Sequence, residues 1–240
     1  MEKIRAYGRV VIFISSMVFY IAVFYLVLPF KKSTLEWGLS LRLHWMKLIH
    51  SVLGLKVEVK GEVPAEGSLL VSNHQSAIDP IVIMKFIKVF PVGKYEIRKY
   101  PIIGFAAEKT GVLFVKRNQK DHRTAIRNQI CKLLKSGRSV LLFPEGTVNE
   151  GREVMPLKVG GFSAALKARK PIVPVCIQYH SGDAIWKPGQ GLKSHFFEQI
   201  ENPVLRIDLH FGSPLKVDTP ENLAEQARQF MADKQFFREV

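Results

Sequence analysis

His74 and Asp79 are residues of the types that general-base chemistry requires, and they stand five positions apart. His74 follows the apolar run 69–71, which predicts a buried strand, so a rigid element would deliver the imidazole to an accessible loop. Two residues at this spacing do not share a helical face, so the chain between them must turn back to bring them together. The carboxylate could then bond one ring nitrogen and leave the other free as a base.

Asp79 also has a purely structural interpretation. It stands directly before Pro80, and Asp followed by Pro is typical of a helix N-cap with proline at the first helical position. A helix over 80–88 is therefore expected to begin here. Both interpretations hold together if the backbone of Asp79 starts the helix while its carboxylate turns toward His74. The cap geometry would then fix the five-residue spacing.

Further charged residues follow other apolar runs. Lys116 and Arg117 come after the run 111–115, and Glu145 comes after the run 140–143. Open α/β sheets place their sites at the carboxyl ends of strands, so we expect these residues near His74. A His–Asp pair without a nucleophile of its own implies that the nucleophile, such as a hydroxyl, belongs to the substrate. The neighbouring cations indicate that this substrate carries an anion, such as a phosphate.

Several other chemistries lack their sequence patterns. The chain contains no Gly-x-Ser-x-Gly, no Gly-x-x-x-x-Gly-Lys-Ser/Thr and no Gly-x-Gly-x-x-Gly, which argues against a serine elbow and against nucleotide binding. No His-Glu-x-x-His or comparable ligand cluster indicates a metal. Cys131 and Cys176 fall in helical and strand patterns, so we interpret them as small buried hydrophobes of a domain that faces a reducing cytoplasm.

The pattern of elements from residue 55 onward predicts an α/β fold with a mixed, largely parallel sheet flanked by helices, because apolar runs alternate with helical patterns. The expected strands are 57–61, 68–72, 90–94, 111–115, 140–143, 171–177 and 205–211. The expected helices are 80–88, 101–109, 121–135 (closed by Gly137), 162–170 and a last one capped by Thr219 and Pro220.

The first 55 residues differ in character from the rest. Residues 10–30 are apolar and uncharged, and as a helix they would be about 30 Å long, which matches a bilayer core. Cations flank both ends, so the charges leave open whether this helix spans the bilayer or enters one leaflet and returns. Residues 35–55 predict a basic amphipathic helix at a membrane interface, with a surface helix packed on the domain as the alternative. We therefore divide the chain into a membrane-anchoring two-helix module, 1–55, and an α/β domain, 56–240.

The net charge of +14 and the pI of about 9.8 indicate an anionic partner: nucleic acid, an anionic membrane surface or a phosphorylated substrate. The basic residues cluster around the apolar module and the strand ends, and no nucleic-acid recognition motif or stacking platform is visible. These features favour a membrane and an anionic substrate over nucleic acid.

Four blocks, in order, resemble those of the glycerolipid acyltransferases, and among them the bacterial 1-acyl-sn-glycerol-3-phosphate acyltransferases. The resemblance runs from about residue 61 to residue 177. Residues 73–79 match the family's His-x4-Asp block, 111–117 its Gly-x-x-Phe-Ile/Val-x-Arg block, 143–147 its Phe-Pro-Glu-Gly-Thr block and 172–175 its Val-Pro strand. The stretches 94–104 and 156–160 also resemble family sequences.

The resemblance implies an O-acyltransferase that moves a fatty acyl group from acyl-CoA or acyl carrier protein to a lyso-phospholipid hydroxyl. The implied product is phosphatidic acid, made for phospholipid biosynthesis, with no bound cofactor and no metal. It also implies a cell-membrane location with the catalytic domain on the cytoplasmic face. The implied catalytic pair is His74 and Asp79. Lys94 is a candidate for stabilising the oxyanion or contacting the donor, and the backbone N–H groups near Gly146 are the other candidate for the oxyanion. The implied acceptor-binding residues are Lys116, Arg117, Glu145, Gly146, Thr147 and Lys158.

One departure bears on the acceptor. The third block of the family often continues with Arg-Ser, whereas here Val148 and Asn149 follow Thr147, with Arg152 slightly later. The acceptor could therefore be a different lyso-lipid, such as a lyso-aminolipid. Two further alternatives remain open: a membrane-bound lipid or thioester hydrolase, in which His74 activates water, and a non-catalytic lipid-binding protein.

Overall fold

The computed structural model describes residues 2–148, 153–187, 189–216 and 218–235. Within these residues, the strands of the sheet are β1 (Leu55–Lys60), β2 (Leu69–Ser72), β3 (Val89–Lys94), β4 (Leu113–Val115), β5 (Ser139–Leu142), β6 (Ile172–Tyr179) and β7 (Leu205–Phe211). The α-helices are α1 (Glu2–Val27), α2 (Thr34–Leu53), α3 (Asp79–Met84), α4 (Pro101–Lys109), α5 (Lys120–Lys135), α6 (Gly160–Ala168), α7 (Leu192–Glu201) and α8 (Pro220–Lys234). Short 3-10 helices cover Leu28–Phe30, Tyr95–Lys99 and Gly182–Ala184.

The strands form one seven-stranded sheet in the order β1-β7-β6-β2-β5-β3-β4. Every neighbouring pair is parallel except β6 and β7, which are antiparallel. The sheet is therefore mixed and largely parallel, as the sequence predicts. The strands β2 to β6 all point the same way, so the segments that follow them meet at one edge of the sheet, and His74 lies there directly after the central strand β2.

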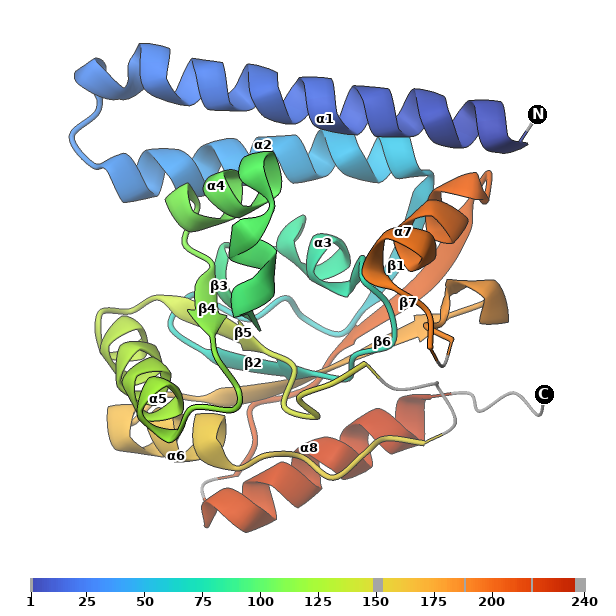
Figure 1. The fold of residues 1–240 in the computed structure, drawn as a ribbon. Helices are drawn as coiled ribbons and strands as arrows, with labels where there is room; N and C mark the ends of the chain where they lie inside the picture. The colour runs from blue at the N-terminus through green and yellow to red at the C-terminus, as the bar shows by residue number, and fades with distance from the viewer. Residues whose placement is uncertain (1, 149–152, 188, 217, 236–240) are drawn as a thin grey trace.

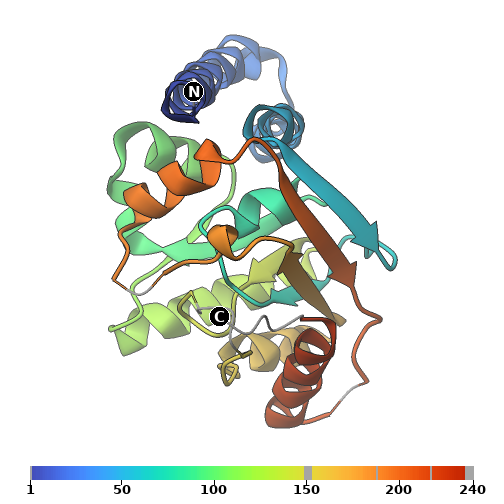
Figure 2. The same cartoon turned by 90° about the vertical axis from the view of Figure 1, so that its right-hand side faces the viewer.

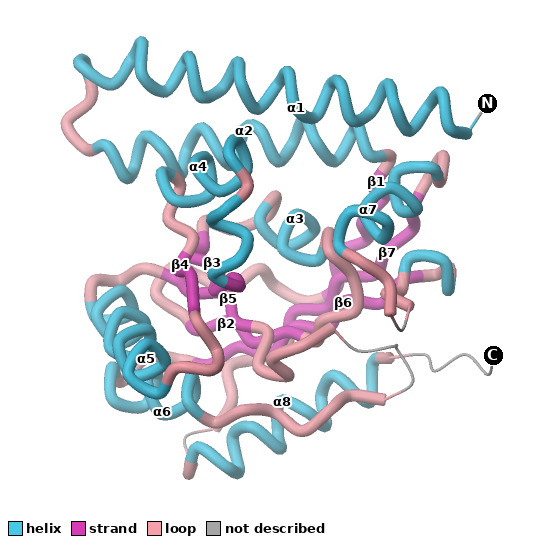
Figure 3. Tube along the Cα trace, in the orientation of Figure 1, coloured by secondary structure: helices cyan, strands magenta, loops and turns pink. Residues whose placement is uncertain are grey.

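Helices cover both faces of the sheet (Figures 1 and 3). α5, α6 and α8 cover one face, and α1, α2, α3, α4 and α7 lie over the other. Each face has its own hydrophobic core, because the fully buried strands carry apolar side chains on both sides. Leu69 and Val71 belong to the core under α5, α6 and α8, while Leu70 belongs to the core under α2 and α3.

The helix ends agree with their local sequence. Ser33 caps α2, where its hydroxyl accepts from Glu36 N, and Gly54 closes the helix with a φ of 69°. The hydroxyl of Thr219 accepts from Asn222 N at the start of α8, as predicted. Gly137 has a φ of 79° and its N–H donates to Leu134 O, so it closes α5 in the predicted position.

The first two helices pack on the sheet domain along their length. α1 and α2 lie side by side above the sheet, and Figure 2 shows both almost end-on. Phe13 and Met17 of α1 and Ile49 of α2 belong to the same buried core as Leu70 of β2. One continuous core therefore joins the two parts of the chain. Our division at residue 55 stays a prediction.

One helix was absent from our prediction. The segment between β6 and β7 contains α7, which the sequence did not reveal because its apolar residues Phe196, Phe197 and Ile200 form only a short pattern. The helix predicted over 80–88 is shorter than expected, because α3 ends at Met84, and α6 begins and ends two residues before the predicted range 162–170. The remaining helices and strands confirm the prediction within a few residues, except that α1 begins at Glu2, eight residues before the predicted start.

Candidate active site

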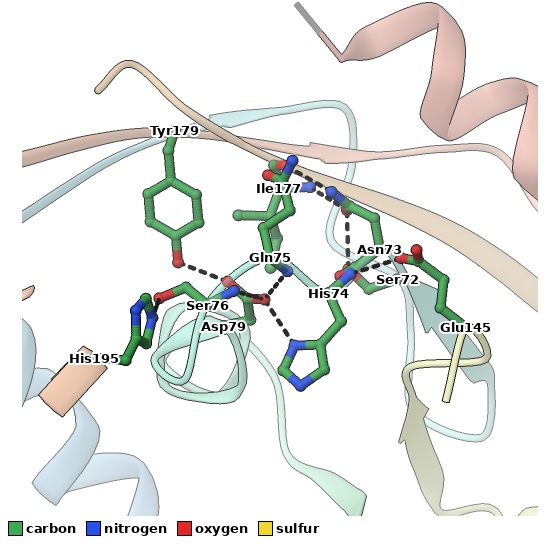
Figure 4. Close-up of polar contacts among 10 residues, drawn as sticks. All are labelled: Ser72, Asn73, His74, Gln75, Ser76, Asp79, Glu145, Ile177, Tyr179 and His195. Carbon is green, nitrogen blue, oxygen red and sulfur yellow. Dashed lines mark hydrogen bonds and ion pairs between the residues drawn. The ribbon is translucent and has the colours of Figure 1, made fainter. Parts of the chain in front are cut away.

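The segment from Asn73 to Asp79 forms a tight turn at the carboxyl end of β2. Asn73 anchors its start, because its side chain accepts from Ile177 N at 2.8 Å and donates to Ile177 O at 2.9 Å. The turn brings His74 Nδ1 to 2.8 Å from Asp79 Oδ2 (Figure 4). The chain therefore turns back as the five-residue spacing requires. The other ring nitrogen, Nε2, makes no hydrogen bond to any residue that the structure describes.

The Asp79 carboxylate is completely buried and receives four hydrogen bonds. Oδ2 accepts from the backbone N–H of Gln75 at 2.7 Å and of Ser76 at 2.8 Å, in addition to His74. Oδ1 accepts from the Tyr179 hydroxyl at 2.6 Å. A buried carboxylate is costly unless donors surround it, and here the donors come from its own turn and from β6.

The predicted N-cap role of Asp79 is wrong. Ile78 is the N-cap of α3, Asp79 is the first helical residue and Pro80 the second, and no side chain caps the helix. The carboxylate instead bonds the N–H groups of Gln75 and Ser76, which precede the helix. These two bonds, rather than cap geometry, hold the turn that brings Asp79 to His74 over five residues.

Glu145 lies on the other side of His74 and is 3% exposed. Its Oε1 accepts from the backbone N–H of His74 at 2.9 Å, and its Oε2 accepts from Met155 N at 3.2 Å. The carboxylate therefore orders the site by joining the turn after β2 to the loop after β5. The ring of His74 stacks on Phe143 at 4.3 Å, which limits its rotation.

A cavity of about 810 Å³ opens beside His74. Its walls are mostly apolar and come from α1, α2, α3, α4 and β3. Lys94, Arg117 and Thr147 line the cavity together with His74, so the structure brings these four predicted residues to one space. A chain-like apolar ligand would fit between the helices, with its polar end at His74.

Two of the predicted cations, Arg117 and Lys158, contact Gly146. Arg117 Nη1 donates to Gly146 O, and the Lys158 ammonium lies against the Gly146 Cα, where a Cβ would collide with it. Gly146 also has a φ of 74°, a left-handed backbone conformation that favours glycine. Burial lowers the pKa of Arg117 from its ordinary value, although nearby Glu96 opposes this, and Arg117 stays charged.

The last of the predicted acceptor-binding residues is Lys116. Lys116 directs its ammonium over the Tyr95 ring, 4.5 Å from the centroid, and is not among the residues that line the cavity. The backbone N–H of Gly146 donates to Phe143 O at 3.1 Å, which leaves Lys94 as the stronger of our two candidates for stabilising an oxyanion. Among the described residues, no group of three or more His, Cys, Asp or Glu side chains could hold a metal ion.

The sequence model of one protein family, described as Acyltransferase, matches residues 55–178. That range is more than half of the chain, and it contains the turn after β2, the loop after β4 and the loop after β5. This chain belongs to the acyltransferase family. The resemblance found in the sequence is thereby confirmed.

Individual acyltransferases with two different acceptors are similar to this chain. The lyso-ornithine lipid O-acyltransferase of Rhizobium meliloti (strain 1021) is 31% identical over 204 residues, which cover 77% of this chain and 70% of that protein. The 1-acyl-sn-glycerol-3-phosphate acyltransferase of Escherichia coli (strain K12) is 31% identical over 140 residues, 56% of this chain and only 57% of that protein. This chain thus spans a little over half the length of the second relative.

A crystal structure from the family has the same fold. The 1-acyl-sn-glycerophosphate (LPA) acyltransferase PlsC from Thermotoga maritima superposes with a TM-score of 0.72, covering 97% of this chain and 92% of that one. The two sequences are 18% identical, so the likeness concerns the architecture. It includes the N-terminal helices, which the family match does not reach.

The Phe-Pro-Glu-Gly-Thr block of this acyltransferase, residues 143–147, is followed by residues that depart from the family pattern. Val148 is half-buried and lines the cavity where the family often has a cation. Asn149 and Arg152, which we noted in the sequence, lie outside the described residues.

Sequence reasoning missed the residues that reach the catalytic turn from the second half of the chain. Tyr179 lies 100 positions after Asp79, which it bonds, and His195 lies 119 positions after Ser76, whose hydroxyl it contacts at 2.9 Å. The one signal available for Tyr179 was its position at the end of a buried strand, at the same edge of the sheet as the turn that contains His74. His195 had no such signal, because α7 itself was not predicted.

Proposed function

We propose that this acyltransferase transfers a fatty acyl group from a thioester to the free hydroxyl of a lyso-lipid, with His74 as the general base. One observation carries the proposal: the imidazole is bonded through Nδ1 to a buried carboxylate while its other side opens on an apolar cavity of about 810 Å³. A base with a fixed tautomer beside a lipid-sized cavity fits the activation of a lipid hydroxyl.

The reaction follows from this geometry. Nε2 of His74 takes the hydroxyl proton as the lipid oxygen attacks the thioester carbonyl carbon, which forms the new C–O bond. The Asp79 carboxylate stabilises the imidazolium, and Lys94 at the cavity wall would stabilise the oxyanion. Collapse of the intermediate breaks the C–S bond, and the departing thiolate receives the proton from His74. A positioned base contributes roughly 10²–10⁴-fold, so orientation of both substrates must supply much of the remaining acceleration.

The acceptor that we place first is 1-acyl-sn-glycerol-3-phosphate, with phosphatidic acid as the product of this step in phospholipid biosynthesis. Arg117 lines the cavity and Lys158 lies beside it at Gly146, which supports the binding of a phosphate. Glu145, Gly146 and Thr147 would shape this acceptor site, and Lys116 would add to its positive field. The donor would be acyl-CoA or acyl carrier protein, delivered from the cytoplasmic face of the membrane.

A second acceptor, a lyso-aminolipid, is favoured by a specific observation. The Rhizobium meliloti relative, named for a lyso-ornithine lipid, aligns over more of this chain than the Escherichia coli phosphate-acceptor enzyme does. Val148 also stands at the cavity wall where the phosphate-binding pattern often continues with Arg.

The decisive experiment is an assay of the full chain purified in detergent, in which lysophosphatidate and a lyso-ornithine lipid are each combined with acyl-CoA and with acyl carrier protein donors. We expect ester formation with at least one pair, and loss of at least about a hundredfold for His74→Ala. His44→Ala serves as the matched control, because His44 is exposed on α2 and lies outside the cavity. A fully active His74→Ala variant would remove the mechanism. Fatty acid release that is insensitive to both acceptors would instead indicate a hydrolase.

Arg117→Ala separates the two acceptors. If the acceptor is a phosphate held by Arg117, the variant should raise KM for lysophosphatidate about tenfold or more, because a charge-assisted pair is lost. Turnover with the lyso-ornithine lipid alone would show that the phosphate assignment of Arg117 is wrong.

A further inference from the structure

The Asp79 carboxylate is held from two sides. The turn supplies the N–H groups of Gln75 and Ser76 to Oδ2, and β6 supplies the Tyr179 hydroxyl to Oδ1 at 2.6 Å (Figure 4). Tyr179 is 1% exposed. Burial and the neighbouring Asp79 carboxylate raise the pKa of Tyr179 well above its ordinary value, so the hydroxyl remains a donor at every working pH.

The turn itself is held by α7 and by the segment between β6 and α7. His195 of α7 is completely buried, and its Nε2 lies 2.9 Å from Ser76 Oγ. The backbone N–H of Trp186 donates to Gln75 O at 2.8 Å, and the Trp186 ring stacks on His195 at 4.5 Å. Both residues whose N–H groups bind Asp79 are therefore fixed from outside the turn.

His195 has one tautomer that satisfies its surroundings. Its Nδ1 lies 3.2 Å from Gln190 Oε1, which can only accept, so Nδ1 carries the proton and Nε2 accepts from the Ser76 hydroxyl. Burial lowers the pKa of His195 from its ordinary value against the opposing field of Asp79 and Glu198, which favours this neutral form. A neutral His195 adds no positive charge beside His74.

We propose that Tyr179 and His195 are positioning residues for acyl transfer, Tyr179 by orienting the Asp79 carboxylate and His195 by holding Ser76 in the turn that binds it. The proposal rests on the proposed role of His74 as the base. Tyr179 and the turn together prevent the carboxylate from rotating about its Cβ–Cγ bond, so Oδ2 stays aligned with Nδ1 of His74. Nε2 is then presented to the cavity in a single orientation, as a near-attack geometry requires.

The first test is Tyr179→Phe, which removes one hydroxyl and keeps the ring. We expect kcat to fall about 10- to 100-fold, the loss expected for a buried hydrogen bond to a charged group, while KM for both substrates stays within about twofold. The acid limb of the pH–rate profile should move to lower pH, because a misaligned carboxylate stabilises the imidazolium less. Tyr25→Phe, an exposed residue of α1 outside the cavity, should change neither quantity.

The second test uses His195 and Ser76. His195→Ala should lower kcat about 3- to 30-fold, since it removes the acceptor of one buried hydroxyl. His195→Gln should recover most of that loss, because its terminal amide oxygen reaches the place of Nε2. Ser76→Ala and His195→Ala should be non-additive when combined, since both remove the same contact. Thermal unfolding of each variant identifies those that are only less stable.

The possible results divide clearly. Wild-type activity and an unshifted pH profile for Tyr179→Phe, with His74→Ala inactive, would overturn the positioning role while leaving the proposed function intact. An active His74→Ala would overturn the proposed function first. A shift of the acid limb to higher pH would also contradict the proposal, because it would show that Tyr179 only weakens the charge of Asp79. Additive losses for Ser76→Ala and His195→Ala would remove His195 from the proposal.

Discussion

His50 is a buried histidine outside the active site. It is 1% exposed on α2, its Nε2–H donates to Ile81 O at 2.9 Å, and its Nδ1 has no hydrogen-bond partner among the described residues. Burial lowers its pKa from 6.5 to about 4, with the bond to Ile81 opposing the shift and Lys85 adding to it. The neutral ring therefore belongs to the folded state, and protonation favours unfolding.

The stability of the protein should consequently depend on pH through His50. The unfolded state binds the proton below pH 6.5 and the folded state only below about 4, so this contribution is fully present above 6.5 and is lost as pH falls toward 4. The loss amounts to at most about 3 kcal/mol. His50→Gln keeps a donor for Ile81 and does not titrate, so its urea unfolding free energy should fall less between pH 7 and pH 4 than that of the wild type.

The control for this measurement is His44→Gln, because His44 is exposed on the same helix. It should keep the pH dependence of the wild type. Equal slopes for the His50 and His44 variants would show that protonation of His50 does not influence folding.

Between elements, Arg42 joins α2 to the start of β3 and to the end of α4. Its side chain is 6% exposed, and its guanidinium donates to Thr110 O at 2.6 Å, after α4, and to Val89 O at the start of β3. Burial lowers its pKa to about 10, so it remains charged at neutral pH without a carboxylate partner among the described residues. The planar fork reaches two carbonyls that belong to different elements.

Replacing Arg42 should therefore loosen α2 from the sheet. Arg42→Met fills the space but leaves two carbonyls without their donors, and we expect the unfolding free energy to fall by about 2–4 kcal/mol. Arg42→Lys should recover only part of this loss, because an ammonium cannot span both carbonyls. Lys47→Met, on the exposed side of the same helix, should change stability by less than about 0.5 kcal/mol. Equal stability of the two methionine variants in urea unfolding would contradict this role.

For the whole molecule, α1 provides an outer apolar surface. The segment Glu2–Phe30 is long and apolar enough to cross a membrane. One side of α1 packs inward through Ala6, Phe13, Met17 and Phe24, while large apolar side chains remain exposed on the other. Phe19 is 62% exposed and Leu26 is 76% exposed. Because α1 lies along α2 and above the sheet, we expect this outer side to enter a lipid surface, with the domain beneath it (Figure 1).

This arrangement predicts membrane binding through the outer side of α1. The double variant Phe19→Glu/Leu26→Glu should bind phospholipid vesicles at least about tenfold more weakly, because it places two charges where apolar side chains would be buried. Flotation with vesicles measures the bound fraction. The matched control is Asn128→Glu/Gln129→Glu on α5, which makes the same change in charge on the opposite side of the sheet. Equal flotation of the two double variants would contradict this orientation.

The α/β class, most of the elements and the family could all be predicted from the amino-acid sequence. Local patterns were sufficient for this, because buried parallel strands are short apolar runs and each site loop directly follows one. The His74–Asp79 pair was also predictable, since the bond between them and the two N–H groups that hold Asp79 all lie within one short turn. The misassigned N-cap of α3 shows the limit: an Asp before Pro satisfies two patterns, and only the neighbouring N–H groups decide where its carboxylate points.

Tertiary structure alone decided what surrounds that pair. The order of the strands places β6 beside β2, which brings Tyr179 to Asp79 over 100 positions of chain. The packing of α7 brings His195 to Ser76, although no local pattern predicted this helix. The cavity likewise exists only because α1 and α2 close over β3 and α3. Contacts of this kind depend on how distant elements pack, and hydrophobic periodicity carries no information about which residues will meet.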